Sequence, residues 1–282
     1  VFARANGMNL GDVAQSMTIH DGTAYIVVNN SGIVFGIDPE TFRIERVIRG
    51  IGSPRYICFN DSVAYVTSLY EPRIAVVDVA TAAVADYIET PDHTSTEQMA
   101  IWGDTLYVSC WSYDDAVLMV DLTSGEVAGE IGVRSQPRQI ALDGDGRLWV
   151  LTDGGYGEGS SPKPPALYRI DVASGSIERE FVFRMGDTPR GLAVGAGGDT
   201  VYFLNGDVWR MDTDAEELPR EPFIPASNTI YYALGVDPRR GDIYVGDAID
   251  YQQQGVVYRF SADGRGLDTL RVGIIPTDFC FR

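Results

Sequence analysis

The chain has 282 residues, 45% of them hydrophobic, and a formal net charge of −18. This length and composition can bury a large core in one or two domains, and the charge argues against nucleic acid as a partner, because neutralising phosphates requires clustered lysine and arginine. No apolar run approaches the ~20 residues that a membrane-spanning helix needs.

In chain order, the sequence divides into short strand-like runs separated by turn residues. Residues 1–5 are expected to form an outer strand, and six similar units follow, which begin at Gln15, Pro54, Glu97, Gln136, Thr188 and Tyr231. The unit at 54–90 contains four apolar runs, at 55–59, 63–67, 74–77 and 84–88. Such runs predict four short antiparallel strands in each unit.

An aromatic residue recurs about every forty residues, after a polar turn and among apolar neighbours. The set is Tyr25, Tyr65, Tyr107, Trp149, Tyr202 and Tyr244. An aspartate recurs at the end of the third strand in five of the six units, where its carboxylate is expected to fix the next turn: Asp38, Asp78, Asp121, Asp171 and Asp212. Repeats of this length made of short strands are typical of a β-propeller. We therefore expect an all-β fold with one β-propeller domain over residues 1–282.

The two ends of the chain predict a seventh blade. Residues 276–281 read as another first strand, and residues 1–5 stand where a fourth strand belongs. Propellers commonly close by pairing strands from both termini in one blade. We therefore expect a seven-bladed β-propeller of four-stranded antiparallel blades. Its seventh blade would be split between the termini and would lack its two middle strands, which would lie upstream of Val1.

The predicted loops differ between the two ends of the blades. The first-to-second and third-to-fourth turns are short and plain, whereas the second-to-third loops and the links between blades are irregular and aromatic. Aromatic rings supply contact area and polar groups fix orientation, so the irregular end suits ligand binding. The ligand-binding candidates are Asn29, Arg55, Tyr70, Gln98, Trp111, Tyr113, Arg138, Tyr156, Arg190, Tyr232, Tyr251 and Gln252.

Three of these candidates are arginines that follow a proline at the start of a first strand: Arg55, Arg138 and Arg190. Their guanidinium groups could hold a carboxylate or phosphate at the mouth of a central channel. The alternative, favoured in so acidic a chain, is that they pair with neighbouring Asp or Glu.

The cysteines and histidines indicate no metal site. Cys58, Cys110 and Cys280 fall in strand-like runs at wide spacing, which is typical of small buried residues rather than of disulfides or zinc ligands. His20 and His93 are the only histidines.

Four acidic residues near the irregular end could collect a calcium ion: Asp153, Glu158, Asp247 and Asp250. Their spacing is not that of an EF-hand. We expect no metal, no cofactor and no catalytic residues.

Several segments of the sequence resemble the YVTN/YncE-like propellers. They resemble more closely the surface-layer propeller lipoproteins of gut Bacteroidetes. They include residues 10–17, 26–31, 53–56, 95–99, 110–113, 152–156 and 247–255. Some members of that branch are lipoproteins that capture cobalamin at the cell surface and pass it to a TonB-dependent outer-membrane transporter. The resemblance implies an outer-membrane lipoprotein at the cell surface, whose targeting segment and lipid anchor are not in this chain.

The resemblance favours a non-catalytic protein that captures a corrinoid or another bulky small molecule. His93 is then the only candidate to ligate the cobalt, and none is needed. The alternative is a cell-surface propeller that binds a glycan or a protein. An enzyme with a central calcium is disfavoured, because the first strands begin mainly with Arg, Gln, Thr and Tyr.

Overall fold

A computed structural model describes residues 1–155, 162–226 and 229–282. By their contacts these residues divide into two compact units, which we call unit 1 (residues 1–131 with Arg282) and unit 2 (residues 132–281). The prediction of a single domain stays a prediction. Among the described residues, no helix is long and apolar enough to cross a membrane.

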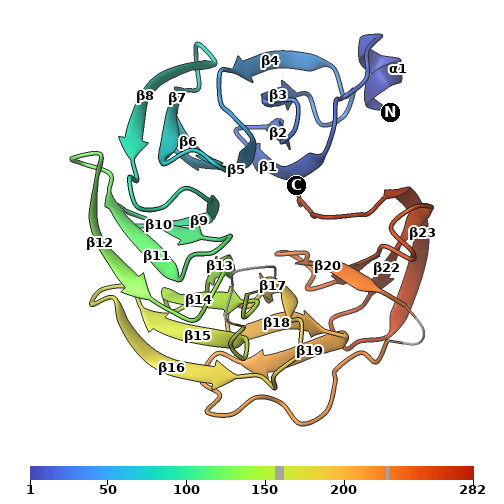
Figure 1. Cartoon of the computed structure of the whole chain (residues 1–282). Helices are drawn as coiled ribbons and strands as arrows, with labels where there is room; N and C mark the ends of the chain where they lie inside the picture. The colour runs from blue at the N-terminus through green and yellow to red at the C-terminus, as the bar shows by residue number, and fades with distance from the viewer. Residues whose placement is uncertain (156–161, 227–228) are drawn as a thin grey trace. The chain divides into compact units, whose positions relative to one another are not determined.

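Unit 1 contains one short helix, α1 (Phe2–Asn6), and three four-stranded sheets in which neighbouring strands pair antiparallel (Figure 1). The first sheet is β1 (Ala14–His20), β2 (Thr23–Val28), β3 (Ile33–Ile37) and β4 (Ile44–Arg49). The second is β5 (Pro54–Asn60), β6 (Val63–Ser68), β7 (Arg73–Asp78) and β8 (Ala83–Glu89). The third is β9 (Thr96–Trp102), β10 (Thr105–Cys110), β11 (Ala116–Asp121) and β12 (Glu126–Gly132).

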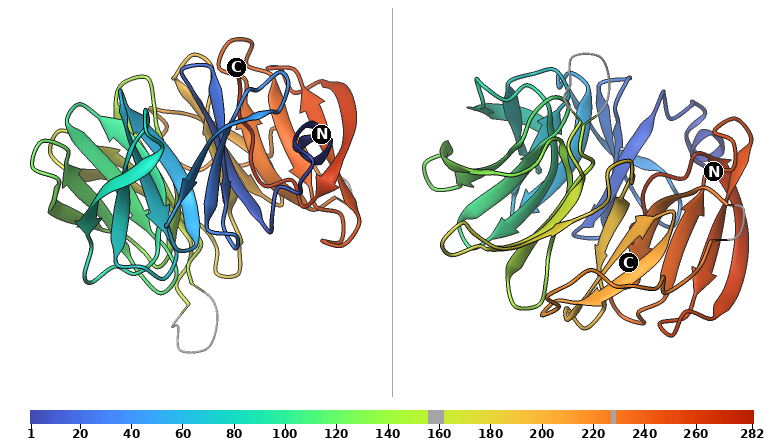
Figure 2. Two further views of the ribbon diagram at one scale, coloured as in Figure 1. Left: turned by 90° about the horizontal axis from the view of Figure 1, so that it is seen from above. Right: turned by 60° about the horizontal axis from the view of Figure 1, so that its bottom comes forward.

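Unit 2 contains the other three sheets, whose twist is visible in Figure 2. The fourth sheet is β13 (Pro137–Leu142), β14 (Arg147–Thr152), β15 (Ala166–Asp171) and β16 (Ser176–Val182). The fifth is β17 (Arg190–Val194), β18 (Thr200–Asn205) and β19 (Asp207–Asp212). The sixth is β20 (Tyr231–Val236), β21 (Ile243–Asp247), β22 (Gln254–Phe260) and β23 (Gly266–Ile274).

These sheets are the blades of a β-propeller, so the all-β class and the propeller fold are confirmed. The expected seventh blade is wrong, because the described residues form six blades. The fifth blade also has three strands rather than four, and at its outer edge a single bridge joins Val208 to Ile224.

The two terminal segments that predicted the seventh blade have other structures. Residues 2–6 form α1, which ends at Gly7 in the left-handed conformation (φ 68°), and Phe2 packs its ring 5.2 Å from that of Phe35. Residues 276–281 follow β23, the last strand of the described residues, and belong to no strand themselves. They cross the sixth blade instead, where the Phe281 ring lies 5.3 Å from the ring of Tyr244 and a side chain at Gly235 would collide with Phe279.

The recurring aromatic residues all lie on the second strand of a blade, as expected. Their cross-strand partners on the first strand are Thr18, Cys58, Ala100, Ala141, Ala193 and Gly235. Small partners leave room for each ring on the face of the sheet, where cross-strand pairs stabilise the blade. Trp149, Tyr25 and Tyr107 are accordingly almost fully buried.

The core lies between neighbouring blades within each unit. Tyr25 and Val27 of the first blade pack with Ile57 and Val66 of the second, for example. In unit 2, Trp149 of the fourth blade shares a cluster with Phe203 of the fifth. Each sheet is therefore stabilised by burying its faces against the sheets beside it.

Four of the five recurring aspartates fix turns through their carboxylates, as predicted: Asp38, Asp78, Asp121 and Asp171. Asp38 Oδ1 accepts the amides of Glu40 (2.8 Å) and Thr41 (2.7 Å), and Asp78 Oδ1 accepts that of Thr81 (2.7 Å). Because these bonds favour the ionised carboxylate, the turn amides hold the pKa of Asp38 and of Asp78 below the usual 3.8.

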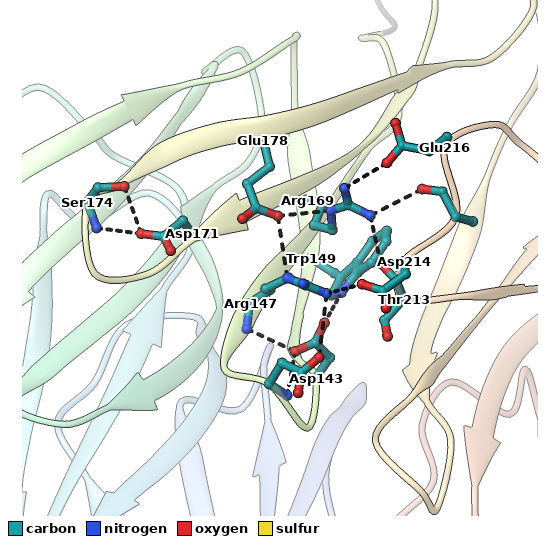
Figure 3. Close-up of polar contacts among 12 residues, drawn as sticks. Asp143, Arg147, Trp149, Arg169, Asp171, Ser174, Glu178, Thr213, Asp214 and Glu216 are labelled. Carbon is teal, nitrogen blue, oxygen red and sulfur yellow. Dashed lines mark hydrogen bonds and ion pairs between the residues drawn. The ribbon is translucent and has the colours of Figure 1, made fainter.

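A polar network in unit 2 joins the turn between β13 and β14 to the segment that follows β19 (Figure 3). Arg169 Nη1 donates to the carbonyl of Thr213 (2.7 Å), and Arg169 Nε pairs with Glu178 (3.0 Å). Asp143 accepts the indole N–H of the buried Trp149 (2.9 Å). Arg169 thus bonds groups of both the fourth and the fifth blade, which gives the network a structural role joining the two blades.

Candidate functional site

Antiparallel order gives every blade two different ends. The turns after the first and third strands lie at one end, called here the turn end, and the second-to-third loops and blade links lie at the other, called the loop end. Hydrogen bonds tie the loop ends of neighbouring blades together within unit 1, since Asn29 Nδ2 donates to the carbonyl of Pro54 (3.0 Å) and the Ser68 amide donates to Thr96 Oγ1 (3.1 Å). Within each blade, the turns and loops thus separate as the sequence predicted.

A β-bulge interrupts the pairing at the loop end of the first strand in each of the six described blades. The register shifts between residues 14 and 16, 54 and 57, 96 and 99, 137 and 139, 190 and 193, and 231 and 233. Arg55, Gln98, Arg138 and Tyr232 lie inside these bulges. A bulge changes the direction of a side chain and is common beside binding sites, so the backbone itself sets these four candidates apart.

In unit 1, two side-chain hydroxyl groups accept backbone N–H groups at β-bulges, where the hydrogen bonding between strands is interrupted. Thr67 Oγ1 accepts the Tyr56 amide (3.0 Å), and Ser109 Oγ accepts the Gln98 amide (3.1 Å). Both hydroxyls are fully buried. The bulges are thus completed by specific side chains rather than left as unpaired backbone.

Unit 2 brings three of the predicted residues into one cluster. Arg190 begins β17, Tyr232 lies in β20, and Tyr251 lies in the loop between β21 and β22. The Arg190 guanidinium carbon stands 5.3 Å from the Tyr232 ring centroid, and the rings of Tyr232 and Tyr251 meet edge to face at 5.7 Å and 82°. Tyr251 is 43% exposed. We call these three residues the Arg190 platform. These contacts orient the two tyrosine rings, which form a flat surface partly exposed to solvent, with the positive charge of Arg190 at one side.

A pocket of about 310 Å³ adjoins this platform in unit 2. Its charged lining residues are Arg138, Asp153, Lys163, Asp187 and Arg190. Each of the two acids already accepts a backbone N–H, from Gly155 (2.9 Å) and Arg184 (2.9 Å). Among the described lining residues, three cations therefore stand beside two acids, in a chain of net charge −18. We call this pocket the arginine pocket.

Three of the predicted loop tyrosines have left-handed backbone. The φ angles are 76° at Tyr70, 70° at Tyr113 and 63° at Tyr251. Bulky residues rarely adopt this conformation, and such strained residues cluster at binding and active sites. Tyr70 and Tyr113 are also 73% and 69% exposed. Unit 1 therefore presents two aromatic side chains to solvent at its loop end.

Arg55 is held differently from the arginines of unit 2. Its Nε and Nη2 donate to the two carboxylate oxygens of Glu97, each at 2.6 Å, and Nη1 donates to Gln15 Oε1 (2.8 Å). The Arg55 and Glu97 side chains are only 8% and 0% exposed. The guanidinium also lies 5.6 Å from the Trp111 ring centroid. The alternative in which an arginine pairs with an acid is thus realised for Arg55.

The remaining candidates are scattered. Asn29 is buried, Gln98 is half-buried, and Gln252 is exposed. The Gln252 amide donates to Asp250 Oδ1 (3.0 Å), which makes its loop a fixed turn. Tyr156 lies outside the described residues.

The proposed calcium ligands do not assemble. Asp247 is 3% exposed, and its Oδ1 accepts the amides of Ile230 (3.1 Å) and Ile249 (2.8 Å). Asp250 Oδ1 caps the following turn. Within the part of the chain that the structure describes, neither joins Asp153 in a group able to hold a metal, and Glu158 lies outside that part.

Sequence reasoning missed two features of the loop end. Glu97, the neighbour of the predicted Gln98, neutralises Arg55, and Lys163 lines the arginine pocket. A buried acid next to a first-strand bulge has no signal in local composition. Cys110 is buried as expected, whereas Cys58 and Cys280 are half-buried, and none of the three forms a disulfide within the described part of the chain. Burial raises the pKa of Cys58 to about 11.

Comparisons with known proteins agree with this fold. No curated protein matches the sequence. Hydrazine synthase of Kuenenia stuttgartiensis is similar in structure with a TM-score of 0.74 at 16% identity, over 95% of this chain and 89% of that one. A quinoprotein alcohol dehydrogenase-like protein from Bacteroides thetaiotaomicron is similar with a TM-score of 0.71 at 17% identity, over 96% of this chain and 70% of that one. At these identities the likeness shows the fold alone. The family model described as Domain of unknown function (DUF5074) matches residues 1–272, so the chain belongs to the DUF5074 family.

Proposed function

We propose that this chain is a non-catalytic binding protein that captures a bulky small molecule, and that this molecule is a corrinoid. The observation that carries the proposal is the Arg190 platform beside the arginine pocket. Aromatic faces next to a cationic pocket can bind a ligand that combines a broad apolar surface with an anionic arm. A corrinoid has these features, since its disc is fringed with amides and its nucleotide arm carries a phosphate.

The size of the arginine pocket indicates that the pocket and the Arg190 platform would bind different parts of a corrinoid. At about 310 Å³ it is at the lower limit of sites that enclose a drug-sized ligand. It can therefore receive an arm of a corrinoid but not the disc. In the proposal, Arg138, Lys163 and Arg190 hold the phosphate of the arm, and Tyr232 and Tyr251 contact the disc.

The cellular role is a further part of the proposal. The sequence resemblance supports a surface lipoprotein of the outer membrane that passes its ligand to a TonB-dependent transporter. Protease treatment of intact cells tests this location, since an exposed lipoprotein is degraded while a periplasmic control protein survives.

Calorimetric titration with two corrinoids tests the ligand. Cyanocobalamin carries the nucleotide arm and cobinamide lacks it, so the chain is expected to bind cyanocobalamin at micromolar concentrations and cobinamide more weakly. Arg138→Ala should remove most of that difference. Tyr232→Ala should weaken both ligands by about 1–3 kcal/mol, the range for a central aromatic contact.

The alternative is a propeller that binds a glycan or a protein, favoured by the exposed Tyr70 and Tyr113. Absence of heat with either corrinoid, together with binding to a glycan array, would replace the corrinoid proposal by this one. Equal affinity for the two corrinoids would refute the assignment of the arginine pocket.

A further inference from the structure

Three side chains of unit 1 gather their metal-binding atoms at the loop end of the third blade. One ligand atom from each of His93, Cys110 and Asp114 lies within 4.8 Å of the other two. His93 belongs to the link between β8 and β9, Cys110 ends β10, and Asp114 lies in the loop between β10 and β11. The three residues thus come from neighbouring segments at one end of one blade.

Each of the three is fixed by its own backbone contacts. The His93 amide donates to the carbonyl of Thr90, and Thr90 Oγ1 donates to the carbonyl of His93, both at 2.9 Å. Asp114 Oδ1 accepts the amides of Asp115 (2.8 Å) and Ala116 (3.2 Å), which leaves Oδ2 turned toward His93 Nδ1 at 2.8 Å. Cys110 pairs with Thr96 in the sheet. The backbone of the three residues is therefore fixed before any ligand arrives, so that only side-chain rotations remain, which lowers the cost of binding.

A fourth group faces the other nitrogen of the imidazole. Glu130 Oε2 lies 3.4 Å from His93 Nε2. When one histidine nitrogen binds a metal, the other commonly donates to a carboxylate, which fixes the orientation of the ring. Glu130 is 64% exposed and so stands at the wet edge of the group, whereas the side chains of His93 and Asp114 are 16% and 14% exposed and Cys110 is 0% exposed.

From this arrangement we propose that His93, Cys110 and Asp114 bind a divalent transition metal of the zinc type, with Glu130 beside the imidazole and one position left for water or a ligand. One nitrogen, one sulfur and one oxygen suit zinc or cobalt, whereas calcium and magnesium prefer oxygens alone. Ligand atoms around a tetrahedral zinc ion are about 3.3–3.7 Å apart. The 2.8 Å separation of His93 Nδ1 and Asp114 Oδ2 must therefore widen by about half an ångström, which side-chain rotation allows.

The competing interpretation is an ion pair in which a protonated His93 bridges Asp114 and Glu130. Such a pair has no use for the thiol of Cys110. Replacing Cys110 therefore distinguishes a metal site from an ion pair. Cys58 is the control residue, because it is a half-buried thiol on β5 outside the group.

Titration of the metal-free chain with Co²⁺ tests the site. The wild type and Cys58→Ser should bind one Co²⁺ per chain and show a thiolate-to-cobalt charge-transfer band, and Zn²⁺ should abolish the band by competition. Cys110→Ser should lose the band. Its Zn²⁺ affinity should fall by at least about tenfold, since even groups that only hold a ligand in place contribute that much.

A second variant covers the case in which Cys110→Ser does not fold. His93→Gln changes a less buried side chain, and it should keep the circular dichroism of the wild type while losing the rise in Tm that Zn²⁺ causes in the wild type. A wild type that shows no charge-transfer band at millimolar Co²⁺ would overturn the proposal. An equal Zn²⁺-induced rise in Tm in the wild type, Cys110→Ser and His93→Gln would do so too, because binding would then lie elsewhere.

Discussion

The buried pair of Arg55 and Glu97 allows a quantitative prediction for Glu97→Gln. The variant keeps the shape of the side chain but removes the negative charge, and one of the two carboxylate oxygens that accept Arg55 at 2.6 Å becomes an amide nitrogen. Gln15 and the Trp111 ring remain as neighbours of the guanidinium but supply no negative charge. Breaking a buried pair by removing one partner costs about 3–5 kcal/mol, because the other charge stays buried. A domain has only about 5–15 kcal/mol of stability, so the loss is a large fraction of it.

The assay is urea unfolding followed by tryptophan fluorescence. The exposed pair of Arg73 and Glu71 provides the control, since its side chains are 38% and 30% exposed with 3.1 Å between Nε and Oε2. Glu71→Gln should cost less than about 1 kcal/mol.

The double replacement Arg55→Met with Glu97→Leu should lie within about 1 kcal/mol of the wild type, because an apolar pair of similar size avoids desolvating two charges. The reasoning fails if Glu97→Gln costs no more than Glu71→Gln, or if the double variant is as unstable as the single one.

Three further outcomes are expected. Tyr251→Ala should weaken corrinoid binding by about 1–3 kcal/mol in calorimetry, while Arg239→Ala, at the turn end, should leave the binding unchanged. Equal losses of binding in the two variants would contradict a binding site at the loop end. Asp143→Ala should lower the free energy of unfolding by about 1–3 kcal/mol, because the buried N–H of Trp149 loses its acceptor; an unchanged urea midpoint would contradict this. The pKa of Asp78 is lowered by the turn amides, so its stabilising effect is complete above the usual 3.8 and is lost as the pH falls below that value. In thermal melts, Asp78→Asn should therefore lose less Tm than the wild type between pH 5 and pH 3.

The repeating strands could be predicted closely because their cause is local. The runs expected at 55–59, 63–67, 74–77 and 84–88 lie within β5, β6, β7 and β8. Alternating apolar residues form a strand wherever one face can be buried, and a small residue opposite each recurring aromatic makes that burial possible. The turns at the aspartates could be predicted for the same reason, since each carboxylate accepts backbone amides only two or three positions later in the sequence.

The terminal segments were predicted wrongly because a strand requires a partner. Residues 1–5 can form a strand or a helix, and Ala3 and Ala5 favour the helix when no neighbouring strand is present. The apolar Phe2 is satisfied by burial against Phe35 in either case. Residues 276–281 likewise bury Phe279 and Phe281 against the sixth blade without a ladder. Hydrophobic pattern alone does not separate a strand from a segment that packs across a sheet.

The three arginines show where prediction of a binding site from repeats ends. Arg55, Arg138 and Arg190 occupy the same place in their units, each after a proline at the start of a first strand and each at or beside a bulge. The repeat therefore explains their backbone. Their chemistry depends on residues far away in the sequence: Glu97, 42 positions after Arg55, neutralises that guanidinium, whereas Arg190 is stacked on Tyr232 and lines the arginine pocket with Arg138. An arginine paired with a buried acid has its charge neutralised within the fold, whereas an arginine that lines a pocket can bind an anion. The partner, which the repeat does not encode, decides between the two roles.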